Sequence, residues 1–254
     1  MRRKYLGIYS LFVMFMLLTF SVGCCAVKVP NLPSSNKIKR VADNSGFEYQ
    51  SVVFITVQPH SSQLMQDIFG PDWEFIQKSF KHTGSGVVIG TDRMGSDILT
   101  AGHVCEQTDE VGEPAPWPLM VSVYDWQGNG YEALVIKYQR DPDMCLLRVP
   151  GVKFPQALKF AKEDPEIGSR ITNVAYPLGI YVPGAPLLFE GRFSGSEPDG
   201  DHFYTIPVAP GSSGSAVLNE DGEIIGIIYA GVQELPMIAI GTPWDEIVEF
   251  IYIK

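Results

Sequence analysis

The chain has 254 residues, a hydrophobic content of 45% and a formal net charge of −10 at pH 7. This length and composition can bury a large core, which excludes a disordered chain and allows either one large all-β domain or two ordinary domains. The acidic balance, without a face rich in Lys and Arg after the amino terminus, excludes a protein that binds nucleic acid through its phosphates.

The amino-terminal segment has the layout of an export signal. Three basic residues precede an uncharged apolar run from Tyr5 to Val22, which is long for a signal-peptide core and short for a membrane span. Residues 1–23 are therefore predicted to be a signal peptide or a retained membrane anchor. Cys24 ends "SVGC", which resembles a bacterial lipoprotein box with Ser at its leading position, and lipidation there would tether the protein to a membrane. We expect an exported protein, in the periplasm or at the cell surface.

The following elements indicate a β protein. Residues 24–46 are predicted to be a polar linker. After them, short runs rich in β-branched and aromatic residues, such as "SVVFITVQ", "YEALVIKY" and "EIIGIIYAG", alternate with Gly, Pro, Asn and Asp, which is typical of an antiparallel barrel or sandwich. "DRMGSD" and "NEDG" predict hairpin turns.

Two segments break this strand pattern. Gln63 to Phe80 has apolar residues near helical spacing and predicts a helical or irregular insertion. "TPWDEIVEFIYI" predicts a carboxy-terminal helix over 242–252, with Thr242 as its cap and Pro243 at its first position.

The cysteines and histidines in the body of the chain limit which metal sites and disulfides it can form. Cys105 and Cys145 can form a disulfide in an oxidising compartment, and two buried free thiols are the alternative that the sequence favours. His60, His82 and His202 lack mutual metal-ligand spacing, and the cysteines form no CxxC pair. We therefore expect no metal and no organic cofactor.

One histidine, one aspartate and one serine each stand beside a distinctive local sequence. His103 ends a strand-like run in "LTAGHVC", Asp143 opens another in "DPDMCLL", and Ser213 lies in "PGSSGSAV". Attack of a serine on an amide needs a hydroxyl, an imidazole that takes its proton and a carboxylate that orients the imidazole. Each residue alone has a simpler explanation, as a strand-end histidine, a turn carboxylate or a flexible Gly/Ser turn. Their occurrence together, in the order His, Asp, Ser, favours a catalytic set.

With these motifs the chain resembles a trypsin-like (chymotrypsin-fold) serine protease, most of all the bacterial HtrA/V8-type branch, over about residues 47–252. "GSGVVIG", "ILTAGHV", "DMCLL", "IGSRITNVAYPLG" and "PGSSGSAV" carry the resemblance. It implies an all-β fold of two six-stranded antiparallel barrels, at about 47–150 and about 160–241, in a protease domain at 47–254 without a PDZ domain. Ser212 and Ser215 depart from the family pattern, and Ser215 is expected to add a side chain near the substrate backbone.

The resemblance also implies a role for each site residue. His103 would be the general base, Asp143 would orient it, and Ser213 would be the nucleophile. The backbone N–H groups of Gly211 and Ser213 would form the oxyanion hole. The substrate pocket maps to Pro207, Val208, Tyr229, Ala230 and Gly231. Because no acidic residue lies at the bottom of that pocket, we expect cleavage after small or aliphatic residues and no cleavage after Arg or Lys.

The expected function is that of a serine endopeptidase, which cleaves protein or peptide substrates through an acyl-enzyme intermediate. Two alternatives stay open. One is a protease-fold binding or scaffold protein without turnover, and the other is an esterase-type hydrolase that uses the same triad.

Overall fold

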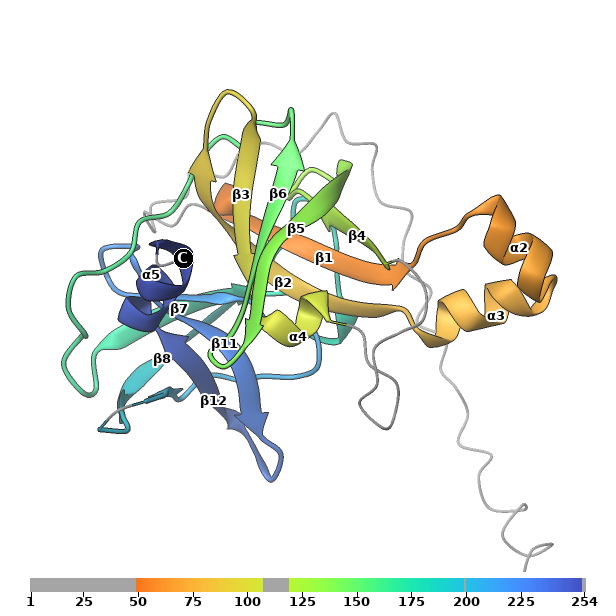
Figure 1. Cartoon of the computed structure of the whole chain (residues 1–254). Coiled ribbons are helices and arrows are strands. Elements are labelled where there is room, and N and C mark those ends of the chain that lie inside the picture. The colour runs from red at the N-terminus through yellow and green to blue at the C-terminus, as the bar shows by residue number, and fades with distance from the viewer. Residues whose placement is uncertain (1–48, 107–118, 199, 253–254) are drawn as a thin grey trace, which may run out of the picture. The chain divides into compact units, whose positions relative to one another are not determined.

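A computed structural model describes residues 49–106, 119–198 and 200–252 of the chain (Figure 1). The predicted signal peptide or anchor at 1–23, the linker at 24–46 and the lipidation site Cys24 lie outside these residues. Within the three described ranges, no helix is long and apolar enough to cross a membrane.

The first half of the described chain closes into a six-stranded antiparallel barrel. Its strands are β1 (Val52–Pro59), β2 (His82–Thr91), β3 (Gly95–Thr100), β4 (Leu119–Tyr124), β5 (Gly130–Arg140) and β6 (Asp143–Pro150). They neighbour one another in the order β1-β2-β3-β6-β5-β4 around the barrel. In β1, Val53, Ile55 and Val57 point into the barrel core, because side chains alternate between the two faces of a strand.

The second half closes into another six-stranded barrel. Its strands are β7 (Arg170–Ala175), β8 (Leu187–Ser196), β9 (His202–Tyr204), β10 (Ala216–Leu218), β11 (Ile224–Val232) and β12 (Leu235–Pro243). Their order around the barrel is β10-β11-β12-β9-β8-β7. Ile171, Phe193, Tyr204 and Ile225 are buried in its core. The predicted all-β fold with two antiparallel barrels is confirmed.

Apolar residues on the outer faces of the strands join the two barrels. Val52 and Phe54, on the outer face of β1, are clustered with Val174 and Tyr176 of the second barrel. A second cluster combines residues of β2, β3 and β6 with residues of β10 and β11 and with Phe250 of α5 (Trp244–Tyr252). Strands that are buried on both faces therefore need apolar residues at consecutive positions, as "VVFITV" has.

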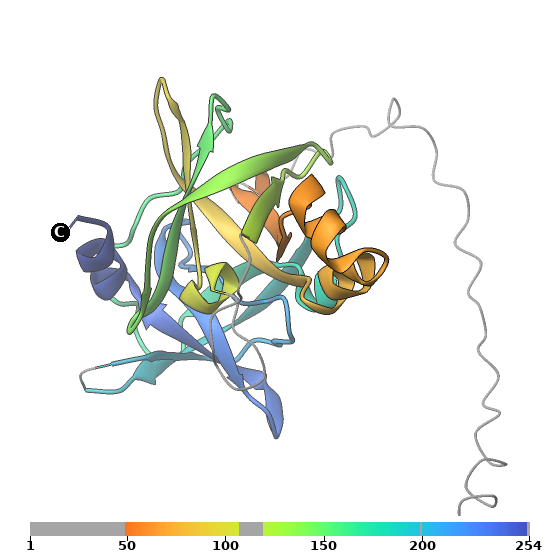
Figure 2. The same cartoon turned by 45° about the vertical axis from the view of Figure 1, so that its right-hand side comes forward.

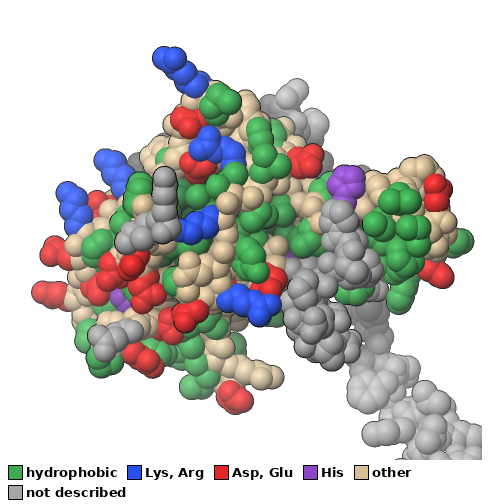
Figure 3. All heavy atoms as spheres, viewed as in Figure 1, with side chains coloured by type: hydrophobic (Ala, Val, Ile, Leu, Met, Phe, Trp, Pro, Cys, Tyr) green, Lys and Arg blue, Asp and Glu red, His purple; other side chains and the backbone are tan. Residues whose placement is uncertain are grey.

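The predicted insertion at 63–80 is helical. It forms α2 (Gln63–Phe69) and α3 (Asp72–Ser79), and Figures 1 and 2 both place it away from α5, at the other end of the two barrels. Trp73 is buried, and the Gln77 side chain donates to the Pro59 carbonyl at the end of β1, at 3.0 Å. Other hydrophobic side chains gather on its surface (Figure 3), with Leu64 and Ile68 exposed.

The carboxy-terminal helix begins later than the sequence predicts. Thr242 and Pro243 belong to β12, where they are paired with Ile227 and Gly226 of β11. Thr242 is buried rather than exposed as a helix cap. The predicted cap is therefore wrong, because ladder pairing with a neighbouring strand overrides the local capping pattern.

Three short elements complete the described part of the chain: η2 (Tyr49–Ser51), α4 (Gly102–Cys105) and η3 (Pro177–Gly179).

Candidate active site

His103 and Asp143 form a pair at the end of the first barrel. His103 lies in the single turn of α4, directly after β3, and Asp143 is the first residue of β6. The imidazole Nδ1 lies 2.5 Å from Asp143 Oδ2, and the backbone N–H of His103 donates to Asp143 Oδ1 at 2.7 Å. The Asp143 side chain is 17% exposed and the His103 side chain is 49% exposed. His103 thus holds both carboxylate oxygens of Asp143, while the edge of its imidazole faces the solvent.

A disulfide joins the segments that carry this pair. Cys105, two residues after His103, is bonded to Cys145, two residues after Asp143. The expectation of two free thiols is therefore corrected. The reason is the pairing of β3 with β6, which places Thr100 opposite Cys145 and brings the start of α4 beside β6.

Ser213 lies in a turn whose backbone needs glycine on both sides. Gly211 has φ +96° and Gly214 has φ +86°, values that side chains with a Cβ rarely adopt. A Cβ at Gly214 would lie 2.0 Å from the Thr100 hydroxyl and 2.1 Å from the Ser85 carbonyl oxygen. The turn at 211–214, called the nucleophile turn after the role that the sequence predicts for Ser213, therefore lies directly against β2 and β3 of the first barrel.

Two amide groups of the turn donate to no acceptor in the part of the chain that the structure describes. Ser212 N–H donates to the Ala209 carbonyl, and Ser215 N–H donates to the Ser212 carbonyl. By contrast, among the hydrogen bonds of the described residues, none uses the N–H of Gly211 or of Ser213 as a donor. These are the two groups that the sequence assigns to the oxyanion hole, and they are free to bind an incoming oxygen.

Two serines beside Ser213 have structural roles. The Ser212 hydroxyl accepts a hydrogen bond from the Ala209 N–H within the turn. Ser215 is fully buried and its hydroxyl accepts from the Asn173 amide, at 2.9 Å, inside the second barrel. The expectation that Ser215 adds a side chain near the substrate is therefore wrong.

The α4 turn and the nucleophile turn meet across Gly84 of β2. A Cβ built on Gly84 would lie 2.8 Å from both methyl groups of Val104 and 3.2 Å from the Ser213 carbonyl oxygen. No hydrogen bond joins the imidazole of His103 to the Ser213 hydroxyl in the described part of the chain. Such bonds are often long in enzymes without substrate and shorten in the complex.

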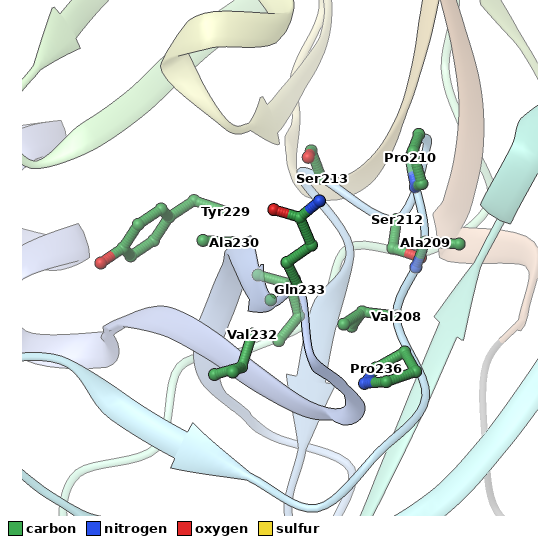
Figure 4. A pocket seen from close by; sticks show the side chains of 12 residues that line it. Val208, Ala209, Pro210, Ser212, Ser213, Tyr229, Ala230, Val232, Gln233 and Pro236 are labelled. Atoms are coloured by element: carbon green, nitrogen blue, oxygen red, sulfur yellow. The ribbon is translucent and has the colours of Figure 1, made fainter.

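A cavity of about 470 Å³ opens beside Ser213 (Figure 4). Four of the five residues that the sequence assigns to the pocket line it, and Pro207 does not. The other lining residues are Ala209, Pro210, Ser212, Ser213, Ile228, Val232, Gln233 and Pro236. None of these lining residues, all of them described, is charged. The cavity thus suits an uncharged side chain.

Part of the pocket that the sequence missed comes from the β11–β12 hairpin, which contributes Val232, Gln233 and Pro236. The Val208 N–H donates to the Pro236 carbonyl at 2.9 Å, which brings the hairpin against the segment before the nucleophile. Gln233 points from the hairpin turn toward the Ser213 side of the pocket (Figure 4). The spacing between strands gave no indication of this register, because β11 and β12 contain two register shifts.

Tyr229 lines the pocket without presenting its hydroxyl to it. The ring extends away from Val208 and Pro236 (Figure 4), and the hydroxyl donates to Asp201 Oδ2 at 2.5 Å. Burial, together with this hydrogen bond and the negative charge of Asp201, raises the pKa of Tyr229. Tyr229 is therefore neutral, and its ring contributes an apolar surface.

The described residues contain no group of three or more His, Cys, Asp or Glu side chains that could hold a metal ion. His60, His82 and His202 are not brought together with one another or with the cysteines into such a group.

Two closed barrels, one with a His–Asp pair and the other with a Gly–Ser turn, define a protein of the trypsin-like class. A family described as "Trypsin-like peptidase domain" matches residues 84–227, and the chain belongs to this family. The matched segment contains "GSGVVIG", "LTAGHVC", "DMCLL" and "PGSSGSAV". The resemblance predicted from the motifs is confirmed.

Curated relatives and solved structures agree with this assignment. Periplasmic serine endoprotease DegP of Escherichia coli (strain K12) is 25% identical over 210 residues, which cover 81% of this chain and 40% of that protein. A probable periplasmic serine endoprotease DegP-like of Pseudomonas fulva (strain 12-X) is 26% identical over 203 residues, or 79% of this chain and 39% of that protein. The chain thus spans about two fifths of these relatives.

Two crystal structures have the same fold. The serine endoprotease from Yersinia pestis superposes with a TM-score of 0.60 at 19% identity, over 82% of this chain and 64% of that one. The active form of the Rv3671c protease from M. tuberculosis superposes with a TM-score of 0.59 at 18% identity, over 80% of each chain.

Proposed function

We propose that this protein is a serine endopeptidase of the HtrA/DegP type, with His103, Asp143 and Ser213 as its catalytic residues. The strongest support is the double contact between His103 and Asp143, in which one residue donates to both carboxylate oxygens. This arrangement fixes the ring and places the proton on Nδ1. Nε2 is then left as the acceptor that a general base needs.

The proposed reaction runs through two acyl transfers. Nε2 of His103 takes the proton of the Ser213 hydroxyl while Ser213 Oγ bonds to the substrate carbonyl carbon. The oxygen that becomes negative is bound by the N–H groups of Gly211 and Ser213, which have no other acceptor among the described residues. The imidazolium gives its proton to the leaving amine, the acyl-enzyme remains, and a water activated by His103 releases the acid.

The substrates proposed for this site are proteins or peptides with an uncharged aliphatic or small residue on the amino side of the cleaved bond. The uncharged lining of the cavity supports this preference. The relatives named as endoproteases support a protein substrate.

We also propose export, with residues 1–23 as a signal peptide or anchor, 24–46 as a linker and 47–254 as the protease domain. The disulfide supports an oxidising compartment, and the relatives are named as periplasmic. Lipidation of Cys24 is proposed as a tether. Metabolic labelling with an alkyne fatty acid should mark the wild type and not Cys24→Ala; equal labelling of both excludes Cys24 as the lipidated residue.

A fluorophosphonate probe tests the proposed triad. The folded full chain should be labelled at Ser213, and Ser213→Ala should not be, with Ser194→Ala, at an exposed serine of β8, as the control that keeps its label. Hydrolysis of casein or of a peptide library then supports a peptidase. Turnover of a p-nitrophenyl ester without peptide hydrolysis would support the esterase alternative, and a folded chain that neither labels nor turns over would support a scaffold.

A further inference from the structure

The buried serine of "GSGVVIG", Ser85 in β2, contacts the nucleophile turn from the opposite barrel. Its hydroxyl donates to the Gly211 carbonyl at 2.8 Å and accepts from the Tyr176 N–H at 2.9 Å. Its own N–H donates to the Ser213 carbonyl at 2.8 Å. Its carbonyl accepts from the Thr100 hydroxyl at 2.7 Å. Ser85 is fully buried, and three of its four hydrogen bonds cross to the second barrel.

Two peptide groups flank Gly211. The hydrogen bond from the Ser85 hydroxyl to the Gly211 carbonyl fixes the peptide between Gly211 and Ser212. The other, between Pro210 and Gly211, is fixed through the Pro210 carbonyl, which accepts from the Leu178 N–H at 2.5 Å. With both carbonyls bonded, rotation of either peptide would break a hydrogen bond, although glycine itself allows many φ and ψ values. Each of the two peptides that flank Gly211 is therefore held by one hydrogen bond.

The direction of the Gly211 N–H follows from this arrangement. The Pro210–Gly211 peptide bond is trans, since Asp141–Pro142 is the cis bond of the described chain, and in a trans peptide the C=O and N–H point in opposite directions. Because the Pro210 carbonyl points to Leu178 in η3, the Gly211 N–H points away from η3. In this orientation the Gly211 N–H donates to no acceptor among the described residues.

We propose that Ser85 is a positioning residue for the reaction, whose hydroxyl holds the Gly211–Ser212 peptide that lies between the two oxyanion donors, the N–H groups of Gly211 and Ser213. This inference rests on the proposed function, since it gives Gly211 a catalytic donor. Ser85 touches no substrate. It acts by bonding to the Gly211 carbonyl and by tying that carbonyl to the end of β7 through the Tyr176 N–H.

Ser85→Ala in the full chain is the decisive variant. Loss of the hydroxyl leaves the Gly211 carbonyl without its donor and lets the Gly211–Ser212 peptide rotate, which changes the angle between the N–H groups of Gly211 and Ser213. We expect kcat on a fluorogenic peptide to fall about 10²-fold, the size of effect that a misplaced reacting group produces, with KM nearly unchanged. A peptide boronate, whose tetrahedral adduct places an oxygen in the oxyanion hole, should bind more weakly by the same factor.

Ser96→Ala is the matched control. Ser96 is also fully buried in the first barrel, donates to the Val152 carbonyl at 2.9 Å and accepts from the Phe154 N–H at 3.1 Å. Ser96→Ala therefore removes hydrogen bonds of the same kinds, one to a backbone carbonyl and one from a backbone N–H, at a residue that does not contact the nucleophile turn. Both variants should lower Tm, and only Ser85→Ala should lower kcat.

The possible results separate this inference from the proposed function. A folded Ser85→Ala with wild-type kcat and boronate affinity overturns the inference, as does an equal kcat loss in Ser96→Ala. If Ser85→Ala does not fold, Ser85→Cys, with a weak donor of similar shape, should fold and lose part of kcat, and full activity overturns the inference. If the wild type itself shows no turnover and no labelling, the proposed function fails. A crystal structure of Ser85→Ala then decides, because an unchanged Gly211 conformation refutes the positioning role.

Discussion

Asp143→Asn should reverse the tautomer of His103 without disturbing the fold. The backbone N–H of His103 is a fixed donor to Oδ1 of residue 143. An asparagine must turn its own oxygen toward that N–H, so its NH₂ group faces the imidazole. Nδ1 then becomes an acceptor, the ring proton moves to Nε2, and Nε2 no longer accepts the Ser213 proton.

The expected size of the loss follows from the role of the carboxylate. In the trypsin-like triad this substitution lowers kcat by about 10⁴-fold, which corresponds to about 5.4 kcal/mol of transition-state stabilisation. KM should change little, because Asp143 lies behind the imidazole and does not line the cavity. Pre-steady-state hydrolysis of an activated ester should show that acylation itself is slowed.

Asp97→Asn is the control for the loss of a carboxylate in the same barrel. Asp97 accepts two hydrogen bonds from Arg148, at 2.6 and 2.8 Å, and its side chain is 28% exposed. It should lower stability and leave kcat within a factor of a few. The reasoning is refuted if folded Asp143→Asn keeps more than about a tenth of the wild-type kcat, or if Asp97→Asn loses as much.

Three further predictions concern stability and specificity. Replacing both Cys105 and Cys145 by Ser opens a 40-residue cross-link and should lower the free energy of unfolding in urea by about 4 kcal/mol on the chain-entropy estimate; a change under about 1 kcal/mol would contradict it. Gly231→Ala should push Val208 into the pocket, because the added Cβ would lie 2.3 Å from a Val208 methyl group, and should lower kcat/KM for large aliphatic residues about 10-fold or more relative to alanine, as measured on paired peptide substrates. A backbone hydrogen bond from Met94 lowers the pKa of Asp92. The stabilising effect of this carboxylate is therefore complete above the pKa of an unfolded aspartate and is lost as pH falls through the lower pKa of the folded state. Asp92→Asn should flatten the dependence of the free energy of unfolding on pH below about 4, and an unchanged slope would contradict this.

The strands and the candidate catalytic residues could be predicted because each depends on local sequence. Alternating apolar runs bounded by Gly, Pro and Asn are set by the period of a strand, and the two barrels bury them as that period requires. His103, Asp143 and Ser213 could be proposed because each stands at the edge of such a run. Long-range geometry was needed to pair His103 with Asp143, which lie 40 residues apart.

What the sequence missed depends on contacts between distant segments. The disulfide requires the β3–β6 register, which opposes Thr100 and Cys145. The β11–β12 hairpin enters the pocket through a register with two shifts. The hydroxyl of Ser85 reaches a carbonyl 126 residues further along the chain, and nothing in "GSGVVIG" distinguishes that serine from any small residue between two glycines.

The bonds made by Ser85 also show that the proposed active site depends on both barrels. The imidazole and carboxylate are fixed by the first barrel alone, through α4, β6 and the disulfide. The nucleophile turn belongs to the second barrel, yet its carbonyls at Gly211 and Ser213 are bonded to β2 of the first. A small separation of the barrels would therefore displace the nucleophile and the oxyanion donors together, relative to a His–Asp pair that stays intact. The packing between the barrels is thus part of the proposed active site, because it sets the distance between the His–Asp pair and Ser213, which neither barrel can fix by itself.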